Sequence, residues 1–356
     1  MGKAPEVDAL LERMGLGSFD RDSLVAPVGR NDVWAGGTTS GRKVFAKRLV
    51  GGDTDVRARM RRLLSFERFS AKLPSAALRG PRFLGCDEEA GIVLFAYVEN
   101  ARTGAELMVD ETFDDALARA VGRAIGLLHG SPVDAADDLD GSAPELPSPA
   151  LLEALPPGMF DHLSFGELQT WRLMQNDPAL IAAVRELRAR EAAAPRAPAH
   201  CDLRVDQLLV TDGGFHLADW EEFRLADPAR DVGGFAGEWL HRSVLDIATS
   251  RGDTEAVDAD LTHETVLRRG VEKIERLRPR IENFWAGYGE TAGRVDADLA
   301  VRATAFAGWH MLDRMMAGSP QRGRISGIER AAAGIGRGIL MNPERFTATL
   351  GLGGAA

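Results

Sequence analysis

The pattern of apolar residues changes near residues 99–104, and this change limits the folds that the chain can adopt. Before that point, short runs rich in β-branched residues are separated by glycines, which is typical of a strand meander. After it, apolar residues repeat at helical spacing over 113–129, 266–287 and 299–316. We therefore predict an α+β fold with a strand-rich domain over 1–99 and a helix-rich domain over 100–356.

The first domain should contain five strands and one helix. The strands are expected over 24–28, 33–38, 44–48, 81–86 and 92–98. Between the third and fourth strands, residues 55–73 lack proline and glycine and place Met60, Leu63 and Phe66 at helical spacing. Three strands, a helix and two further strands form a compact α+β unit.

The second domain should be mainly helical, with one hairpin. Residues 163–175 and 178–194 have helical patterns. Residues 131–158 are rich in proline and aspartate, which indicates a surface loop or lid and no new core element. Two short apolar runs, 207–211 and 215–218, flank Asp212-Gly213-Gly214, which is a hairpin signal.

Charge and cysteine content exclude several classes of protein. Lys and Arg total 43 against 53 Asp and Glu, a net charge of −10. We expect no nucleic-acid and no membrane partner, because both need clustered positive charge. The two cysteines, Cys86 and Cys201, are too few for a disulfide framework. No run reaches the ~18 apolar residues of a membrane span, so we expect a cytoplasmic protein.

Polar residues that could act in catalysis or bind a metal lie on both sides of the hairpin. His200, Asp202 and Gln207 precede it, and Asp219 and Glu221 follow it. The hairpin should turn the chain back so that Asp202 and Asp219 approach each other. Carboxylate and amide oxygens are the ligands that Mg²⁺ prefers. The residues alone leave open that these acids only cap turns and helices.

These motifs resemble those of a known family. His200-x-Asp202-x4-Gln207, Asp219-Trp220-Glu221 and 227–231, together with Lys47 in Val44-Phe45-Ala46-Lys47, are similar in order and spacing to the aminoglycoside-phosphotransferase branch of the protein-kinase-like fold. The resemblance covers about residues 24–235. It implies a two-lobed fold, with a small β-rich N-lobe and a larger helical C-lobe, that binds ATP and Mg²⁺ between the lobes.

The resemblance implies a role for each polar residue near the hairpin. Asp202 would hold and deprotonate the acceptor hydroxyl, and Asp219 would bind the Mg²⁺ that bridges the phosphates. Gln207 would be the other metal ligand, at a position where the family has Asn. The extra methylene of Gln moves the amide oxygen by about 1.5 Å, which leaves open an adapted metal site, weakened activity, or a pseudokinase that binds without turnover.

The resemblance also implies nucleotide contacts in the first domain. Lys47 would bind the α- and β-phosphates, and Glu67, on the following helix, would fix Lys47 by an ion pair. Asn31 belongs to a loop, 29–34, that would cover the phosphates without the usual glycines. The adenine would rest near 97–99, beside Glu99. From the residues alone, Lys47 can also be an edge-strand lysine and Glu67 part of a solvated helix face.

The acceptor is the least constrained part of the prediction. Within the wider family, residues 29–34, 47–49, 202–207 and 219–223 look most similar to stand-alone kinase subunits of class V lanthipeptide synthetases. Those enzymes phosphorylate Ser and Thr of a precursor peptide, and lyase and cyclase partner proteins would then act on the product. The alternatives are a small-molecule kinase for an aminoglycoside-like antibiotic or metabolite, and the pseudokinase.

One basic cluster stands out against the acidic composition. Arg57, Arg59, Arg61 and Arg62 lie within six residues of the predicted helix over 55–73. We expect a solvated helix face, since runs of charge usually face water, with docking of an acidic peptide as the alternative.

Overall fold

The computed structural model describes the chain except for residues 1–4, 27–28, 74–77, 250–262, 322–323 and 354–356. The chain forms two compact units. The sheet unit consists of Met1–Asp110, Val133–Asp140 and Asp206–Phe223, and the helical unit consists of Glu111–Pro132, Gly141–Val205 and Arg224–Ala356. The sheet unit therefore takes in two segments from beyond residue 100, while the domain boundary at 99 stays a prediction.

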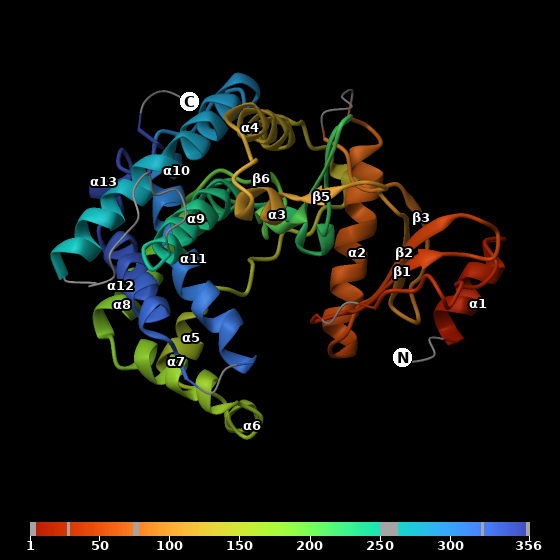
Figure 1. Ribbon diagram of the computed structural model, residues 1–356, viewed down its shortest axis with the longest axis horizontal. Coiled ribbons are helices and arrows are strands. Elements are labelled where there is room, and N and C mark those ends of the chain that lie inside the picture. The colour runs from red at the N-terminus through yellow and green to blue at the C-terminus, as the bar shows by residue number, and fades with distance from the viewer. Residues whose placement is uncertain (1–4, 27–28, 74–77, 250–262, 322–323, 354–356) are drawn as a thin grey trace. The chain divides into compact units, whose positions relative to one another are not determined.

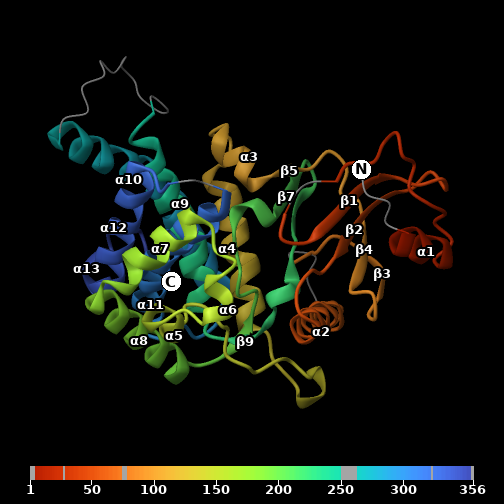
Figure 2. The same cartoon turned by 90° about the horizontal axis from the view of Figure 1, so that it is seen from below.

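The sheet unit is built on a four-stranded antiparallel sheet (Figures 1 and 2). Its strands, in spatial order, are β1 (Asp32–Gly37), β2 (Lys43–Arg48), β4 (Ile92–Ala96) and β3 (Phe83–Asp87). Successive side chains of a strand point to opposite faces, so Val44 and Ala46 share one face while Phe45 and Lys47 share the other. Lys47 is paired with Val93 in the sheet register.

Helices cover both faces of this sheet. The helix α1 (Pro5–Arg13), which the sequence reading did not include, packs with Val44 and Ala46. The long helix α2 (Asp53–Ser70) packs on the other face, where Met60, Leu63 and Val93 belong to one buried cluster. The face of the sheet that carries Lys47 is therefore the face covered by α2.

A second, three-stranded sheet contains the predicted hairpin. It consists of β5 (Arg102–Thr103), β7 (Leu208–Thr211) and β8 (Gly214–Leu217), in that order. Gly214 has φ +118°, a backbone conformation that favours glycine in this tight turn. The short helix α3 (Gly104–Val109) follows β5, and the 3₁₀ turns η1 (Ala135–Asp137) and η3 (Trp220–Glu222) complete the unit. The turn η2 (Val205–Gln207) begins one residue before the unit's last segment.

The helical unit is a bundle built on two close helix pairs (Figure 1). They are α4 (Asp115–Gly130) with α10 (His263–Thr291), and α9 (Ala229–Asp246) with α11 (Leu299–Gly318). A Cβ on Gly122 would lie 2.0 Å from the carbonyl oxygen of Phe284, and one on Gly233 would lie 2.5 Å from that of Ala303. Only glycine therefore allows these backbones to approach so closely.

The remaining elements of the helical unit are shorter or peripheral. They are α5 (Pro149–Glu153), α6 (Pro157–Phe160), α7 (Phe165–Gln175), α8 (Pro178–Ala193), β6 (Ala197–Ala199), β9 (Arg224–Ala226), η4 (Ser319–Gln321), α12 (Gly327–Met341) and α13 (Pro343–Phe346). No helix in the described ranges is both long and apolar enough to cross a membrane.

Most predicted elements are confirmed, with two corrections. The strand expected over 24–28 is, in its described part, a single bridge between Val25 and Ala35. The segment 131–158 is not simply a loop, because it contains η1, α5 and the start of α6, and Leu152 is fully buried. A proline at the first turn, as in α5, starts a helix rather than preventing one, which explains the second error.

Candidate functional site

The hairpin β7–β8 brings two predicted metal ligands to one end of its ladder. Leu208 pairs with Leu217, and the amide of Ala218 donates to the carbonyl oxygen of Gln207 at 2.9 Å. Gln207 and Asp219 therefore leave the hairpin at the same end. Asp219 has φ +69°, a left-handed conformation that turns the chain sharply into η3. Its side chain is 27% exposed, so this carboxylate is accessible to a ligand.

Lys47 lies against two carboxylates of that same turn. Its Nζ contacts Asp219 Oδ1 and lies 3.0 Å from Glu221 Oε2, and the residue is buried. Burial lowers the pKa of Lys47, but the charges of Asp219 and Glu221 and their hydrogen bonds outweigh burial and hold the pKa above its usual value. Lys47 is therefore a fixed positive charge at the end of the hairpin.

Glu221 is held from the opposite side by a second cation. Arg59 on α2 has a completely buried side chain, and its Nη1 lies 3.4 Å from Glu221 Oε1. The Nδ2 of Asn31 donates to Glu221 Oε2 at 3.3 Å, and Asn31 Oδ1 accepts from Arg59 Nη1 at 3.1 Å. Lys47, Glu221, Arg59 and Asn31 form one buried polar network, which we call the lysine network.

The lysine network corrects the expected partner of Lys47. Glu67 makes no ion pair with Lys47, because it lies more than two helical turns beyond Arg59 on α2. Burial raises the pKa of Glu67 to about 7, and no charge enters that shift. At the level of Lys47 the helix instead supplies a cation, Arg59, and the carboxylate comes from Glu221.

Two other predicted nucleotide contacts are placed as follows. Asn31 is buried, and both ends of its amide are bonded within the sheet unit, with the amide of Val50 as a further donor at 3.0 Å. Glu99 is exposed and forms an ion pair with Lys43 at 2.9 Å. From the sequence, Glu221 is expected beside the hairpin without an assigned role, and Arg59 is expected on a solvated helix face. The structure makes both members of the site.

The arginine cluster on α2 divides into a buried and an exposed half. Arg62 is buried, donates to the carbonyl oxygen of Glu221 at 2.8 Å, and lies 3.2 Å from Asp140. Arg57 and Arg61 are exposed and line a concavity of ≈ 980 Å³ beside the β3–β4 turn. The expected solvated face is therefore wrong for Arg59 and Arg62. They share a helical stripe with Phe66 and Phe69, and that spacing is the signal for their burial.

In the helical unit, a buried aspartate holds the loop that carries Asp202. Asp231 accepts hydrogen bonds from the amides of His200 and Cys201, both at 2.7 Å, and its Oδ2 lies 3.0 Å from His129 Nε2. Burial raises the pKa of Asp231, but the hydrogen bond from His129 and the imidazole charges outweigh it, so the pKa lies below its usual value. The amide of Asp202 donates to His200 Nδ1 at 3.3 Å.

Asp202 itself is much more accessible than the loop that carries it. Its side chain is 44% exposed, and its Oδ1 lies 3.7 Å from Arg204 Nε. Cys201, directly before it, has φ +66° and so bends the backbone. A rigid loop therefore holds a solvent-accessible carboxylate, which is the arrangement that a group acting on a diffusing hydroxyl requires.

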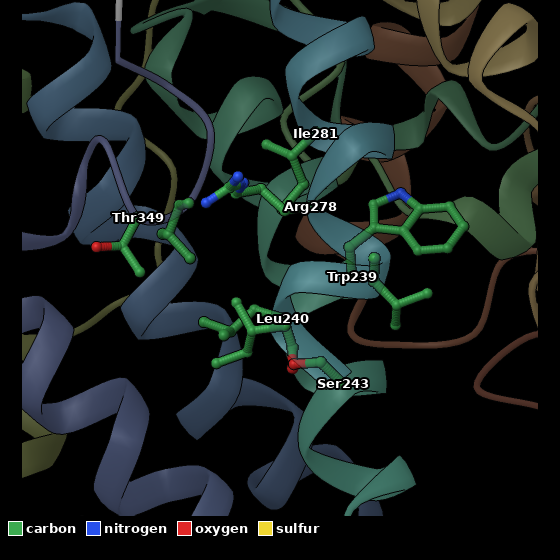
Figure 3. Close-up of a pocket in the computed structure, with 9 residues that line it drawn as sticks. Trp239, Leu240, Ser243, Arg278, Ile281 and Thr349 are labelled. Atoms are coloured by element: carbon green, nitrogen blue, oxygen red, sulfur yellow. The ribbon is translucent and has the colours of Figure 1, made fainter. Parts of the chain in front are cut away.

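A small cavity in the helical unit offers no comparable chemistry (Figure 3). It lies between α9, α10 and Thr349, with Trp239, Leu240 and Ile281 among its lining residues. Its volume of ≈ 10 Å³ holds one water molecule at most, and its lining contains no carboxylate. Within the described ranges, no group of three or more His, Cys, Asp or Glu side chains forms a metal cage.

Comparison with known proteins agrees with this architecture. Three solved structures share the fold: macrolide 2′-phosphotransferase MphH from Brachybacterium faecium (18% identity, 95% of this chain and 98% of that chain, TM-score 0.51), amicoumacin kinase hAmiN in complex with AMP-PNP, Ca²⁺ and amicoumacin (13%, 96% and 96%, 0.54), and LicA in complex with AMP (14%, 95% and 99%, 0.56). Comparison with curated protein sequences gives no match.

The family model is more decisive than any single structure. The model of the phosphotransferase enzyme family, APH, matches residues 28–265, which is more than half of the chain. That span contains Lys47, the Asp202 loop and the Asp219 turn. This chain is a member of the APH phosphotransferase enzyme family, with its α+β kinase-like fold.

Proposed function

We propose that this enzyme transfers the γ-phosphoryl group of ATP to a hydroxyl group of its acceptor, with Lys47, Asp219 and Asp202 as the main participants. The observation that carries the proposal is the contact of the buried Lys47 with Asp219, an accessible carboxylate. Phosphoryl transfer needs charge neutralisation and positioning more than covalent chemistry from the protein. A fixed cation beside a metal-binding carboxylate supplies both requirements.

The donor set at the hairpin end suits a magnesium–nucleotide. ATP and a divalent metal are typical of this family. Mg²⁺ in such sites is bound through one or two protein oxygens and the phosphates, so a cage of three acidic residues is not needed. Asp219 and Gln207, which leave the same end of the ladder, would hold the ion. When bound, the metal neutralises charge on the phosphate oxygens.

The chain's own residues would then divide the remaining work. Lys47 would bind the α- and β-phosphates through Nζ, because its raised pKa keeps it protonated across the physiological range. Asp202 would accept a hydrogen bond from the acceptor hydroxyl and take its proton as the new P–O bond forms and the bond from the γ-phosphorus to the leaving ADP breaks. Asn31 would contribute by ordering the loop over 29–34, and Glu99 by contacting the adenine end of the nucleotide.

The favoured acceptor is a Ser or Thr hydroxyl of a ribosomal precursor peptide, with lyase and cyclase partners acting afterwards. The support is the motif similarity over 29–34, 202–207 and 219–223 to stand-alone lanthipeptide kinases. A second candidate is a small-molecule hydroxyl. It is favoured by the structural relatives, whose names specify a macrolide and amicoumacin.

A transfer assay separates these acceptors. The protein is incubated with Mg²⁺ and γ-labelled ATP, and with either a Ser/Thr-rich precursor peptide or a panel of macrolides and aminoglycosides. Label in the peptide alone supports the peptide kinase, and label in a small molecule alone removes it. A pseudokinase would be stabilised by Mg-ATP in a thermal-shift experiment, by ~2.7 kcal/mol at a hundredfold excess over Kd, and would label neither.

Two variants of the same loop test the assigned base. Asp202→Asn should abolish transfer and preserve the thermal shift with Mg-ATP, because the nucleotide contacts are elsewhere. Asp206→Asn is the matched control, an exposed aspartate four residues later. If Asp202→Asn were as active as the parent on every acceptor, the assignment of the base would be wrong.

A further inference from the structure

We infer that Arg59 is a positioning residue for phosphoryl transfer: it fixes the Glu221 carboxylate, which in turn holds Lys47 in place. This inference rests on the proposed function. It concerns a residue that touches neither the phosphates nor the metal in that proposal. The lysine network would then position Lys47 for phosphoryl transfer as well as stabilise the fold.

Arg59 is anchored more firmly than an ordinary helix arginine. Its Nη2 donates to the carbonyl oxygen of Val50 at 2.6 Å and lies 3.1 Å from Asp55 Oδ2. The amide of Val50 donates to Asn31 Oδ1, which also accepts from Arg59. Arg59, Val50 and Asn31 therefore form a closed ring of hydrogen bonds. The guanidinium has little freedom left to move.

Arg59 is one of two cations that contact the buried Glu221 carboxylate. The Glu221 side chain is only 9% exposed, and a carboxylate at that depth is costly to the fold unless it is paired and hydrogen-bonded. Lys47 lies on its Oε2 side and Arg59 on its Oε1 side. An arginine does not lose its proton in a protein, so it supplies a constant countercharge.

Asp219 alone cannot hold Lys47 throughout the reaction. In the proposed function Asp219 binds the metal, which competes with Lys47 for the same carboxylate. Glu221 is then the second carboxylate in contact with Lys47. Its orientation is set by Arg59 and Asn31, since Arg59 donates to Oε1 and Asn31 donates to Oε2. Removing Arg59 should therefore misplace Lys47 without removing any phosphate ligand.

The test replaces Arg59 with Met and uses Arg57→Met, an exposed arginine on the same helix, as the matched control. A misplacement of Lys47 of about 1 Å should lower kcat/KM for ATP by about 10²-fold in Arg59→Met. Arg57→Met should leave kcat/KM for ATP unchanged.

A double variant distinguishes a loss of positioning from a loss of folding. Arg59→Met leaves Glu221 with fewer partners, whereas Arg59→Met combined with Glu221→Gln removes both charges and should fold. On the Glu221→Gln background, Arg59→Met should lower kcat/KM by less than threefold. Arg59→Lys, which keeps the charge, should retain most of the parental kcat/KM.

The failures of this inference and of the proposed function are distinguishable. If the parent is active, an unchanged kcat/KM in folded Arg59→Met would overturn the positioning role alone. Full additivity of Arg59→Met with Glu221→Gln would do the same. A parent that neither binds Mg-ATP in the thermal-shift experiment nor transfers phosphate to any acceptor would overturn both.

Discussion

Glu67→Gln should stabilise the protein above pH 7 and leave its stability unchanged near pH 4. Burial raises the pKa of Glu67 from 4.5 to about 7. At pH values between 4.5 and about 7, Glu67 keeps its proton in the folded protein but has released it in the unfolded chain. The free energy of unfolding therefore falls as the pH rises through this range. Gln does not titrate, so the variant should lack this fall.

The size of the effect follows from the two pKa values. A pKa raised from 4.5 to about 7 corresponds to ~3 kcal/mol, at 1.36 kcal/mol for each tenfold change in proton affinity. The Glu67 side chain is only partly buried, and water screens part of this penalty. We therefore expect Glu67→Gln to raise the free energy of unfolding at pH 8 by ~1–2 kcal/mol.

Urea unfolding at several pH values between 4 and 8 measures this difference. Glu12→Gln, at an exposed position on α1, is the matched control and should change stability by less than ~0.5 kcal/mol at every pH. An ion pair between Glu67 and Lys47 would reverse the sign, because Gln would then destabilise the protein at pH 8. A destabilised variant at pH 8, or a difference independent of pH, would refute the reasoning.

Three further outcomes are expected. Lys47→Met should abolish the thermal shift with Mg-ATP while Lys43→Met, an exposed lysine of the same strand, keeps it; equal shifts in both would contradict the phosphate role. Asp231→Asn should lower the free energy of urea unfolding by ~3 kcal/mol or more, because two amides and His129 lose a charged acceptor; a loss below ~1 kcal/mol would show that the loop is held otherwise. Burial, with neighbouring charges, lowers the pKa of His241 to about 4, so the parent should lose stability as the pH falls from 6.5 to 4, and His241→Gln should lose less over that range in the same assay.

The hairpin and the strand of Lys47 were predictable because local rules determine them. Asp212-Gly213-Gly214 allows the positive φ that the turn needs, and the flanking residues form the ladder from Leu208 to Leu217. Alternation along β2 assigns Lys47 to the face opposite Val44 and Ala46. The end of the hairpin, with Gln207 and Asp219, follows from the same ladder.

The partner of Lys47 was not predictable by the same means. Arg59 and Glu221 are separated by 162 residues, and the sequence around each one alone predicts an exposed charged side chain. Their pairing depends on how α2 packs against η3, where Phe66 stacks on Trp220 with ring centroids 3.5 Å apart. Sequence periodicity indicates which face of a helix is buried, but it does not indicate which distant segment covers that face.

Lys47 is held by a carboxylate of the η3 turn and not by one of α2, and this determines how a movement of α2 would affect Lys47. If Glu67 on α2 paired with Lys47, any rotation of that helix would break the pair directly. Glu221 instead lies two residues from Asp219 on the same turn, and both contact Lys47. A displacement of α2 would therefore reach Lys47 through the η3 turn, which Arg59, Arg62 and Phe66 of that helix contact. A displacement of the turn would change the predicted metal ligand and the lysine contact together.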